Sequence, residues 1–156
     1  MTEKYESQVC FDTIKLTLDN MGWQYDVKEE FLIATSAKGD GMAIPLFIGI
    51  DPDKPCIFIH SPLTFEIKEN KADIFARAVC ETNISMLIGN FDYDIKNNRI
   101  VFKETLPFMG CLVSEEVCKY LIMLACLMSD KYGGKFYDLN RGAIDLDDYV
   151  KFVQSK

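Results

Sequence analysis

The chain has 156 residues, of which 49% are hydrophobic and 26% charged, and its net charge is −7. This is the composition of an ordinary globular protein. The length predicts one domain, residues 1–156, whose hydrophobic core is large enough to be stable without disulfide bonds or a structural metal. The acidic balance, which includes no run of five like charges, counts against nucleic acid and acidic membrane surfaces as partners.

Six cysteines are spread along the sequence without a CxxC pair, and histidine occurs once. This spacing indicates neither a zinc site nor a thioredoxin-like motif, so we expect buried free thiols in a reducing compartment. The first residues, MTEKYESQ, lack the apolar core of a signal peptide, and by elimination we expect a cytoplasmic protein. The cysteines are Cys10, Cys56, Cys80, Cys111, Cys118 and Cys126.

The first half of the chain predicts one helix followed by a meander of strands. A helix is expected over Ser7–Met21, because Cys10, Ile14 and Leu18 recur one turn apart. The turn signals AKGDG and DPDKP separate the later strands, and such short returns predict antiparallel neighbours. Pro45 predicts a bend within its strand. The strands are expected at Gln24–Val27, Phe31–Ser36, Met42–Ile50 and Cys56–His60.

The second half predicts a helix, a hairpin and two further helices. In chain order these are Lys71–Thr82, the strands Ser85–Tyr93 and Arg99–Leu106 around the turn DIKNN, Ser114–Tyr132, and Asp145–Gln154. Gly133 and Gly134 are expected to end the third helix, so that residues 133–141 form a loop. The order αβββ(β)αββα plus a short C-terminal helix predicts an α+β fold, an antiparallel sheet packed with helices.

The helix at Ser114–Tyr132 is unusual because its middle, Tyr120–Met128, contains no charged residue and is apolar on every side. A helix that is apolar all round is normally covered on more than one side. Either the C-terminal helix covers the spare face, or another protein or a second copy does. We therefore expect a protein-binding surface here, with a sheet face carrying Phe47, Phe58 and Phe102 as the alternative. The expected binding residues are Ile122, Met123, Cys126 and Leu127.

This arrangement resembles the bacterial YbjN family, which shares the fold of the type III secretion chaperones. The similarity is clearest over Lys71–Asp138, in the helix ending at Asn83, the hairpin LIGNFDYDIKNNRIVFKETLPF and the apolar helix that begins SEEV. Some members of the family are described as sensory transduction regulators, and the resemblance carries over no catalytic residue. The minimal chaperone fold lacks the helix at Asp145–Gln154. In this chain, that helix could cover the face through which the chaperones form dimers.

Candidate chemistry in the sequence is sparse. His60 could act as a base with Asp51 or Asp53, although a lone histidine of structural or exposed character is the favoured interpretation. The stretch Asp138–Asp148 hints at a calcium loop, but its glycine arrives one position early and the final glutamate is missing. We favour a loop in which Asp145 caps the last helix.

The acidic residues of the hairpin and three of the cysteines each allow a structural as well as a functional interpretation. Asp92, Asp94 and Glu104 form an acidic group on the hairpin, which we expect to be exposed and solvated. Cys111, Cys118 and Cys126 could sense oxidants, but no cluster of basic residues accompanies them to lower the pKa of a thiol. Packing in the core is the favoured interpretation.

The sequence therefore predicts a non-enzymatic protein-binding or regulatory adaptor of the YbjN type. It predicts no catalytic, cofactor-binding or metal-binding residue, and its expected partner is a protein or a second copy in a homodimer, with no nucleic acid and no membrane. A secretion-type chaperone holding an extended client, and a small-ligand-binding domain or enzyme with a site near His60, remain alternatives.

Overall fold

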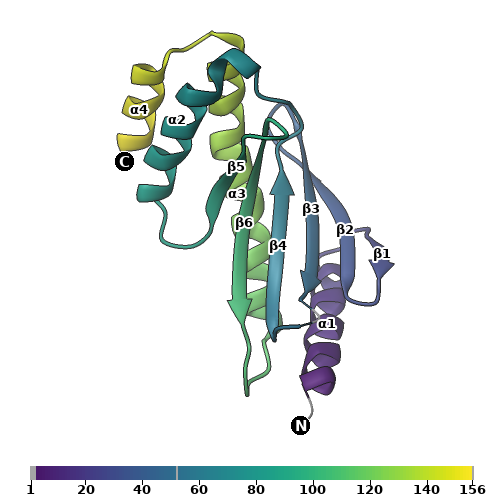
Figure 1. Cartoon of the computed structure of the whole chain (residues 1–156). Helices are drawn as coiled ribbons and strands as arrows, with labels where there is room; N and C mark the ends of the chain where they lie inside the picture. Colours follow the sequence, from purple (N-terminus) through teal and green to yellow (C-terminus); the bar gives the residue numbers. More distant parts are fainter. Residues whose placement is uncertain (1–2, 52, 156) are drawn as a thin grey trace.

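The computed structural model describes residues 3–51 and 53–155, which form six strands, four α-helices and one short 3-10 helix (Figure 1). The elements are α1 (Glu3–Asn20), β1 (Asp26–Glu29), β2 (Leu32–Lys38), β3 (Ala43–Ile50), β4 (Cys56–Pro62), η1 (Glu69–Lys71), α2 (Ala72–Ile84), β5 (Asn90–Asp94), β6 (Arg99–Pro107), α3 (Glu115–Arg141) and α4 (Leu146–Gln154).

The strands make one sheet in the order β1-β2-β3-β4-β6-β5, and every neighbouring pair is antiparallel. This confirms the predicted α+β fold. Pro45 pairs with Ser36 of β2, but the pairing of β3 with β4 reaches only from Ile50 to Phe47. Proline lacks the N–H that a further ladder bond would need, which explains why β3 and β4 separate at this point.

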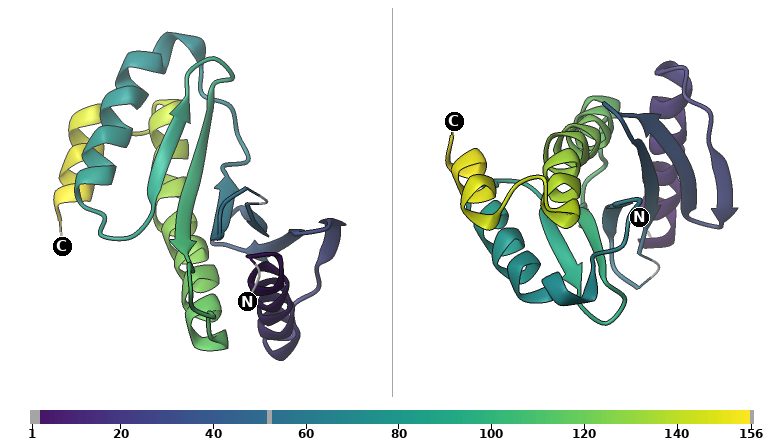
Figure 2. Two further views of the ribbon diagram at one scale, coloured as in Figure 1. Left: turned by 60° about the horizontal axis from the view of Figure 1, so that its bottom comes forward. Right: turned by 90° about the horizontal axis from the view of Figure 1, so that it is seen from above.

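One face of the sheet forms the core with α1 and α3 (Figure 2). Side chains alternate along each strand, so Ile48 of β3 and Ile59 of β4 are buried on this inner face. Phe102 is also on the inner face, because it pairs with the buried Ser61. The prediction that Phe102 shares a face with Phe47 and Phe58 is therefore wrong.

The third helix is longer than predicted, because Gly133 and Gly134 do not end it. Gly133 is buried where α3 passes the sheet closely: a Cβ there would lie 3.3 Å from Leu63 Cδ2. The glycine thus permits close packing, and the helix continues through residues 133–141, which the sequence had predicted as a loop. It ends at Gly142, whose φ of 80° is the left-handed conformation of a helix C-cap.

The C-terminal helix packs against α2 and the last part of α3, far from α1 (Figure 2). Its start is fixed by a capping box in which Asp145 accepts a hydrogen bond from the Asp148 backbone N–H, which confirms the predicted cap. Tyr149 is fully buried, stacks on Phe136 at 5.1 Å, and shares a 2.6 Å hydrogen bond with Thr82.

The link between α2 and β5 differs from the prediction. The strand begins at Asn90 instead of Ser85, because Gly89 adopts a positive φ of 75° that breaks the extended run. Asn83, at the end of α2, makes two hydrogen bonds to the backbone of Phe91 and fixes the start of the strand. Leu87, predicted to alternate within the strand, is instead 97% exposed in the intervening loop.

Candidate functional site

The four residues predicted to bind a protein lie on two sides of α3. Ile122 and Cys126 are buried in the core, whereas Met123 is 47% and Leu127 59% exposed. Cover of the spare face by the C-terminal helix, one of the two alternatives that the sequence left open, is therefore wrong. The C-terminal helix meets α3 near Tyr132, a full helical turn beyond Leu127, so it leaves this flank open.

The open flank of α3 is a continuous apolar surface, which we call the α3 ridge. It consists of Val117, Tyr120, Met123, Leu124 and Leu127, of which Leu124 is half-buried and the others are exposed. The spacings of three and four residues place these side chains on one face of the helix. Large apolar side chains gathered on one exposed face mark a binding surface more often than scattered ones do.

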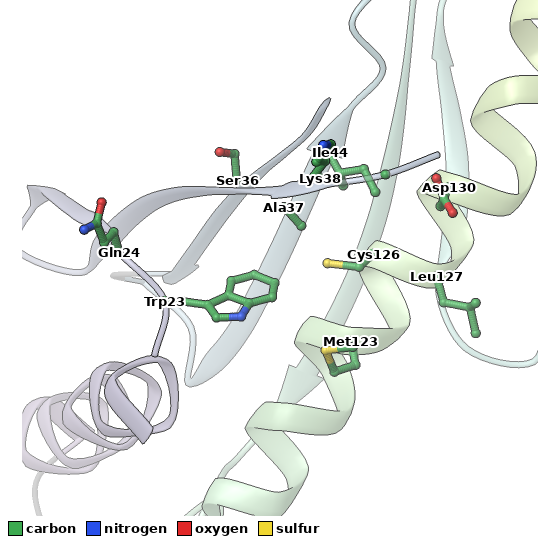
Figure 3. Close-up of a pocket in the computed structure, with 11 residues that line it drawn as sticks. Trp23, Gln24, Ser36, Ala37, Lys38, Ile44, Met123, Cys126, Leu127 and Asp130 are labelled. Carbon is green, nitrogen blue, oxygen red and sulfur yellow. The ribbon is translucent and has the colours of Figure 1, made fainter. Parts of the chain in front are cut away.

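One side of the ridge borders a groove of about 670 Å³, which we call the Trp23 groove (Figure 3). Trp23 follows α1 and its indole extends over the groove toward Met123. Trp23 packs against the core but is only half-buried. The lining residues are Trp23, Gln24, Ser36, Ala37, Lys38, Gly39, Ile44, Met123, Cys126, Leu127 and Asp130.

One end of the Trp23 groove is closed by the β2–β3 turn, which is bound to α3. The Asp40 backbone N–H donates a 2.6 Å hydrogen bond to Asp130 Oδ1. Gly39 allows this close approach: a Cβ there would lie 2.5 Å from Asp130 Oδ1 and 2.9 Å from the Met42 carbonyl oxygen. The turn signal AKGDG thus also positions a wall of the groove.

The variant Gly39→Ala is expected to destabilise the chain by about 1–3 kcal/mol, because the methyl group would force the turn away from Asp130. Urea unfolding of the purified variant measures this loss. Gly134→Ala is the matched control, since a Cβ at Gly134 meets nothing within 4 Å. An unfolding free energy of Gly39→Ala equal to that of the native chain would show that the turn is not held in this way.

The other side of the ridge borders a second groove, of about 360 Å³, against the loop between α2 and β5. Tyr120 and Leu124 of the ridge face Leu87 and Ile88 of that loop across it. The ridge is therefore flanked by a groove on each side, and both grooves are walled by apolar side chains from sequence-distant segments.

A polar group lies beneath this surface, between the sheet and α3. Glu104 is only 3% exposed, and neither carboxylate oxygen has a hydrogen-bond partner among the described residues. Burial raises its pKa to about 8. The buried hydroxyls of Ser61 and Ser129 are likewise unpartnered within the described chain. The expectation that Glu104 is exposed is wrong. Ile100, Phe102 and Glu104 follow one another at two-residue steps along β6, and this alternation was the signal that places Glu104 inward.

His60 is not joined by the two acids proposed for it. It lies on the outer face of the sheet, pairs in register with Phe47 and Lys103, and contacts the Phe58 ring at 4.9 Å. Burial, and then the charge of Lys103, lower its pKa. Asp51 and Asp53 belong to the turn at the other end of β4.

The acidic group predicted on the hairpin is also dispersed. Asp92 makes a 2.9 Å ion pair with Lys103, while Asp94 accepts hydrogen bonds from Asn97 in the turn. Glu104 points to the opposite face of the sheet. These carboxylates therefore do not converge on a common point.

The remaining candidates take structural positions. Asp138, the first residue of the calcium-like stretch, lies within α3 and pairs with Arg141 at 2.9 Å. All six cysteines are free; Cys10, Cys118 and Cys126 are buried as predicted, but Cys80 and Cys111 are exposed. Burial raises the pKa of both Cys118 and Cys126 to about 11, which keeps these thiols protonated at neutral pH.

Comparisons with known proteins identify the fold. No family model matches the chain, and no curated protein does. Among solved structures, the crystal structure of YbjN from E. coli, described as a candidate transcription regulator, matches with a TM-score of 0.55 and 15% identity, over 78% of this chain and 92% of YbjN. The chain has a YbjN-like fold.

This match confirms the fold that the resemblance in the hairpin and the SEEV helix implied. At this identity the likeness concerns the fold and does not transfer a role to individual residues. None of the helices that the structure describes is long and apolar enough to cross a membrane.

Proposed function

We propose that this YbjN-like chain is a non-enzymatic module that docks another protein through the α3 ridge, in a regulatory or adaptor role. The observation that carries the proposal is the exposure of Tyr120, Met123 and Leu127 on a helix whose other flank is buried in the core. The description of YbjN as a candidate transcription regulator agrees with a regulatory role.

The surroundings of the ridge suit a protein partner. An apolar centre with a polar rim is the usual anatomy of a protein–protein interface. Gln24, Ser36 and Lys38 supply such a rim along the Trp23 groove, and Lys131 does so at the loop groove. The two grooves give side chains of the partner a place to enter, which a bare helix would lack.

The placement of the ionisable groups supports a non-enzymatic role. Acid–base catalysis requires groups that converge on one reacting atom. His60 lies on the outer face of the sheet, whereas Glu104 is buried on the inner face. Asp51, the acid proposed for His60, lies at the far end of β4.

The variant Leu127→Asp tests the proposal, because a carboxylate at the ridge centre would have to be desolvated on docking. The tagged chain is used to capture proteins from its own cells, and each captured protein is identified, purified and titrated against the chain. We expect Leu127→Asp to weaken binding by about a hundredfold or more, as for a central interface residue.

Ile95→Asp is the matched control, because Ile95 is also 59% exposed but lies in the β5–β6 turn. It should bind as the native chain does. Equal binding by both variants, with the fold of each intact by circular dichroism, would contradict the proposal. Recovery of unfolded segments instead of folded proteins would favour the secretion-chaperone alternative.

A further inference from the structure

The charges at the two ends of the α3 ridge are opposite. Glu116 lies one turn before Tyr120, and Lys131 lies one turn after Leu127. At about 100° per residue, Glu116, Tyr120, Met123, Leu127 and Lys131 fall within an arc of about 80° on the helix. Glu116 and Lys131 are exposed, and neither forms an ion pair with another described residue.

A helix surface with an apolar middle, an acidic residue at one end and a basic residue at the other is complementary to a second copy of itself that runs in the opposite direction. In an antiparallel pairing centred between Met123 and Leu124, the residues at equal distances from the centre meet. Glu116 of one copy then lies opposite Lys131 of the second copy, and Tyr120 lies opposite Leu127. A two-fold axis produces each of these pairings twice.

We propose that the partner of the α3 ridge is a second copy of this chain, bound antiparallel through α3 with this register. The inference rests on the proposed docking function and names its partner. The apolar ridge supplies the desolvated centre, while the two Glu116–Lys131 pairs at the rim fix direction and register.

The loop between α2 and β5 extends the same surface. Leu87 is 97% exposed and lines the groove beside Tyr120 and Leu124, so it borders the centre of the pairing. A stable interface needs about 800 Å² from each partner, more than a pair of helices alone supplies. Contact between the two copies of this loop provides the remainder.

Sedimentation of the purified full chain over a wide range of protein concentration tests the assembly. We expect a concentration-dependent dimer that Leu127→Asp converts to a monomer and Ile95→Asp leaves unchanged. A native chain that stays monomeric at about 100 µM overturns the dimer. If Leu127→Asp nevertheless abolishes binding of a captured protein, the docking function stands and only its proposed partner is wrong.

A charge exchange tests the register. Glu116→Lys alone and Lys131→Glu alone each place like charges together twice, so each should weaken the dimer by about tenfold. The double variant restores both pairs and should recover native dimerisation. It retains the lysine at the helix start, so recovery cannot come from helix stability. A double variant as weak as the singles overturns the register.

Cross-linking separates the antiparallel pairing from a parallel one. The exposed Cys80 and Cys111 are first replaced by serine. A mixture of the Tyr120→Cys and Leu127→Cys variants should form a disulfide-linked heterodimer on mild oxidation, while each variant alone should cross-link poorly. Efficient self-linking of both variants would indicate a parallel pair and contradict the proposal.

Discussion

Raising the pH from about 5 to about 8 is expected to destabilise the native chain steadily, and Glu104→Gln is expected to remove most of this dependence. The pKa of Glu104 is about 8 in the folded chain, against 4.5 for an unperturbed glutamate. The folded state therefore binds this proton more tightly than the unfolded state does. The stabilisation is complete below the unfolded pKa and is lost as the pH rises toward 8, by about 1.4 kcal/mol per pH unit.

Urea unfolding at one protein concentration and a series of pH values measures this slope for both chains. Glu104→Gln keeps the size of the side chain but stays neutral, so it should match the native chain near pH 5 and exceed it near pH 8. Glu66→Gln, at an exposed carboxylate paired with Arg99, is the control and should leave the slope unchanged. Parallel curves for the native chain and Glu104→Gln would show that the buried carboxyl does not titrate in this range.

Phe136→Ala is expected to cost about 3–5 kcal/mol of unfolding free energy, the range for a large aromatic side chain removed from a core. Phe136 is fully buried where α3 meets α2, α4 and β5. Its ring packs within 6 Å of the rings of Phe75, Phe91 and Tyr149. Truncation would leave a cavity between α3 and the three elements whose rings pack on it.

Thermal and urea unfolding of Phe136→Ala measure this loss. Tyr137→Ala is the matched control, since Tyr137 is the next residue of the same helix but is 46% exposed, and it should cost less than about 1 kcal/mol. Similar losses for the two variants would mean that α3 after Gly133 does not pack as described.

Local signals in the sequence were sufficient for the order and type of the elements. Ser114 accepts a hydrogen bond from the Val117 backbone N–H, and Asp145 caps α4, both as their residue types predict. The alternation of buried and partly buried residues in β4 likewise appears in the sequence as Ile57 and Ile59. Such signals act between residues a few positions apart, so they do not depend on the rest of the fold.

The candidate site was only partly accessible from the sequence. The apolar middle of α3 identified the right segment, but it could not show that Ile122 faces the core while Leu127 faces outward. The Trp23 groove was missed, because its walls come from α3 and from segments about 90 residues earlier, as in the Asp40–Asp130 contact. The spacing of apolar residues within one helix cannot predict which distant segments of the chain pack beside it.

By itself the sequence determined the order of the strands, the N-caps of α3 and α4 and the apolar stretch at Tyr120–Met128, because these follow from backbone preferences and short-range spacing. Only the tertiary structure decided where α3 ends and which of its flanks stays open. Gly133 looks like a helix stop in isolation, yet contact with Leu63 makes it a packing position. The open flank exists because α4 packs against α2 and the far end of α3, a choice made by contacts between distant residues.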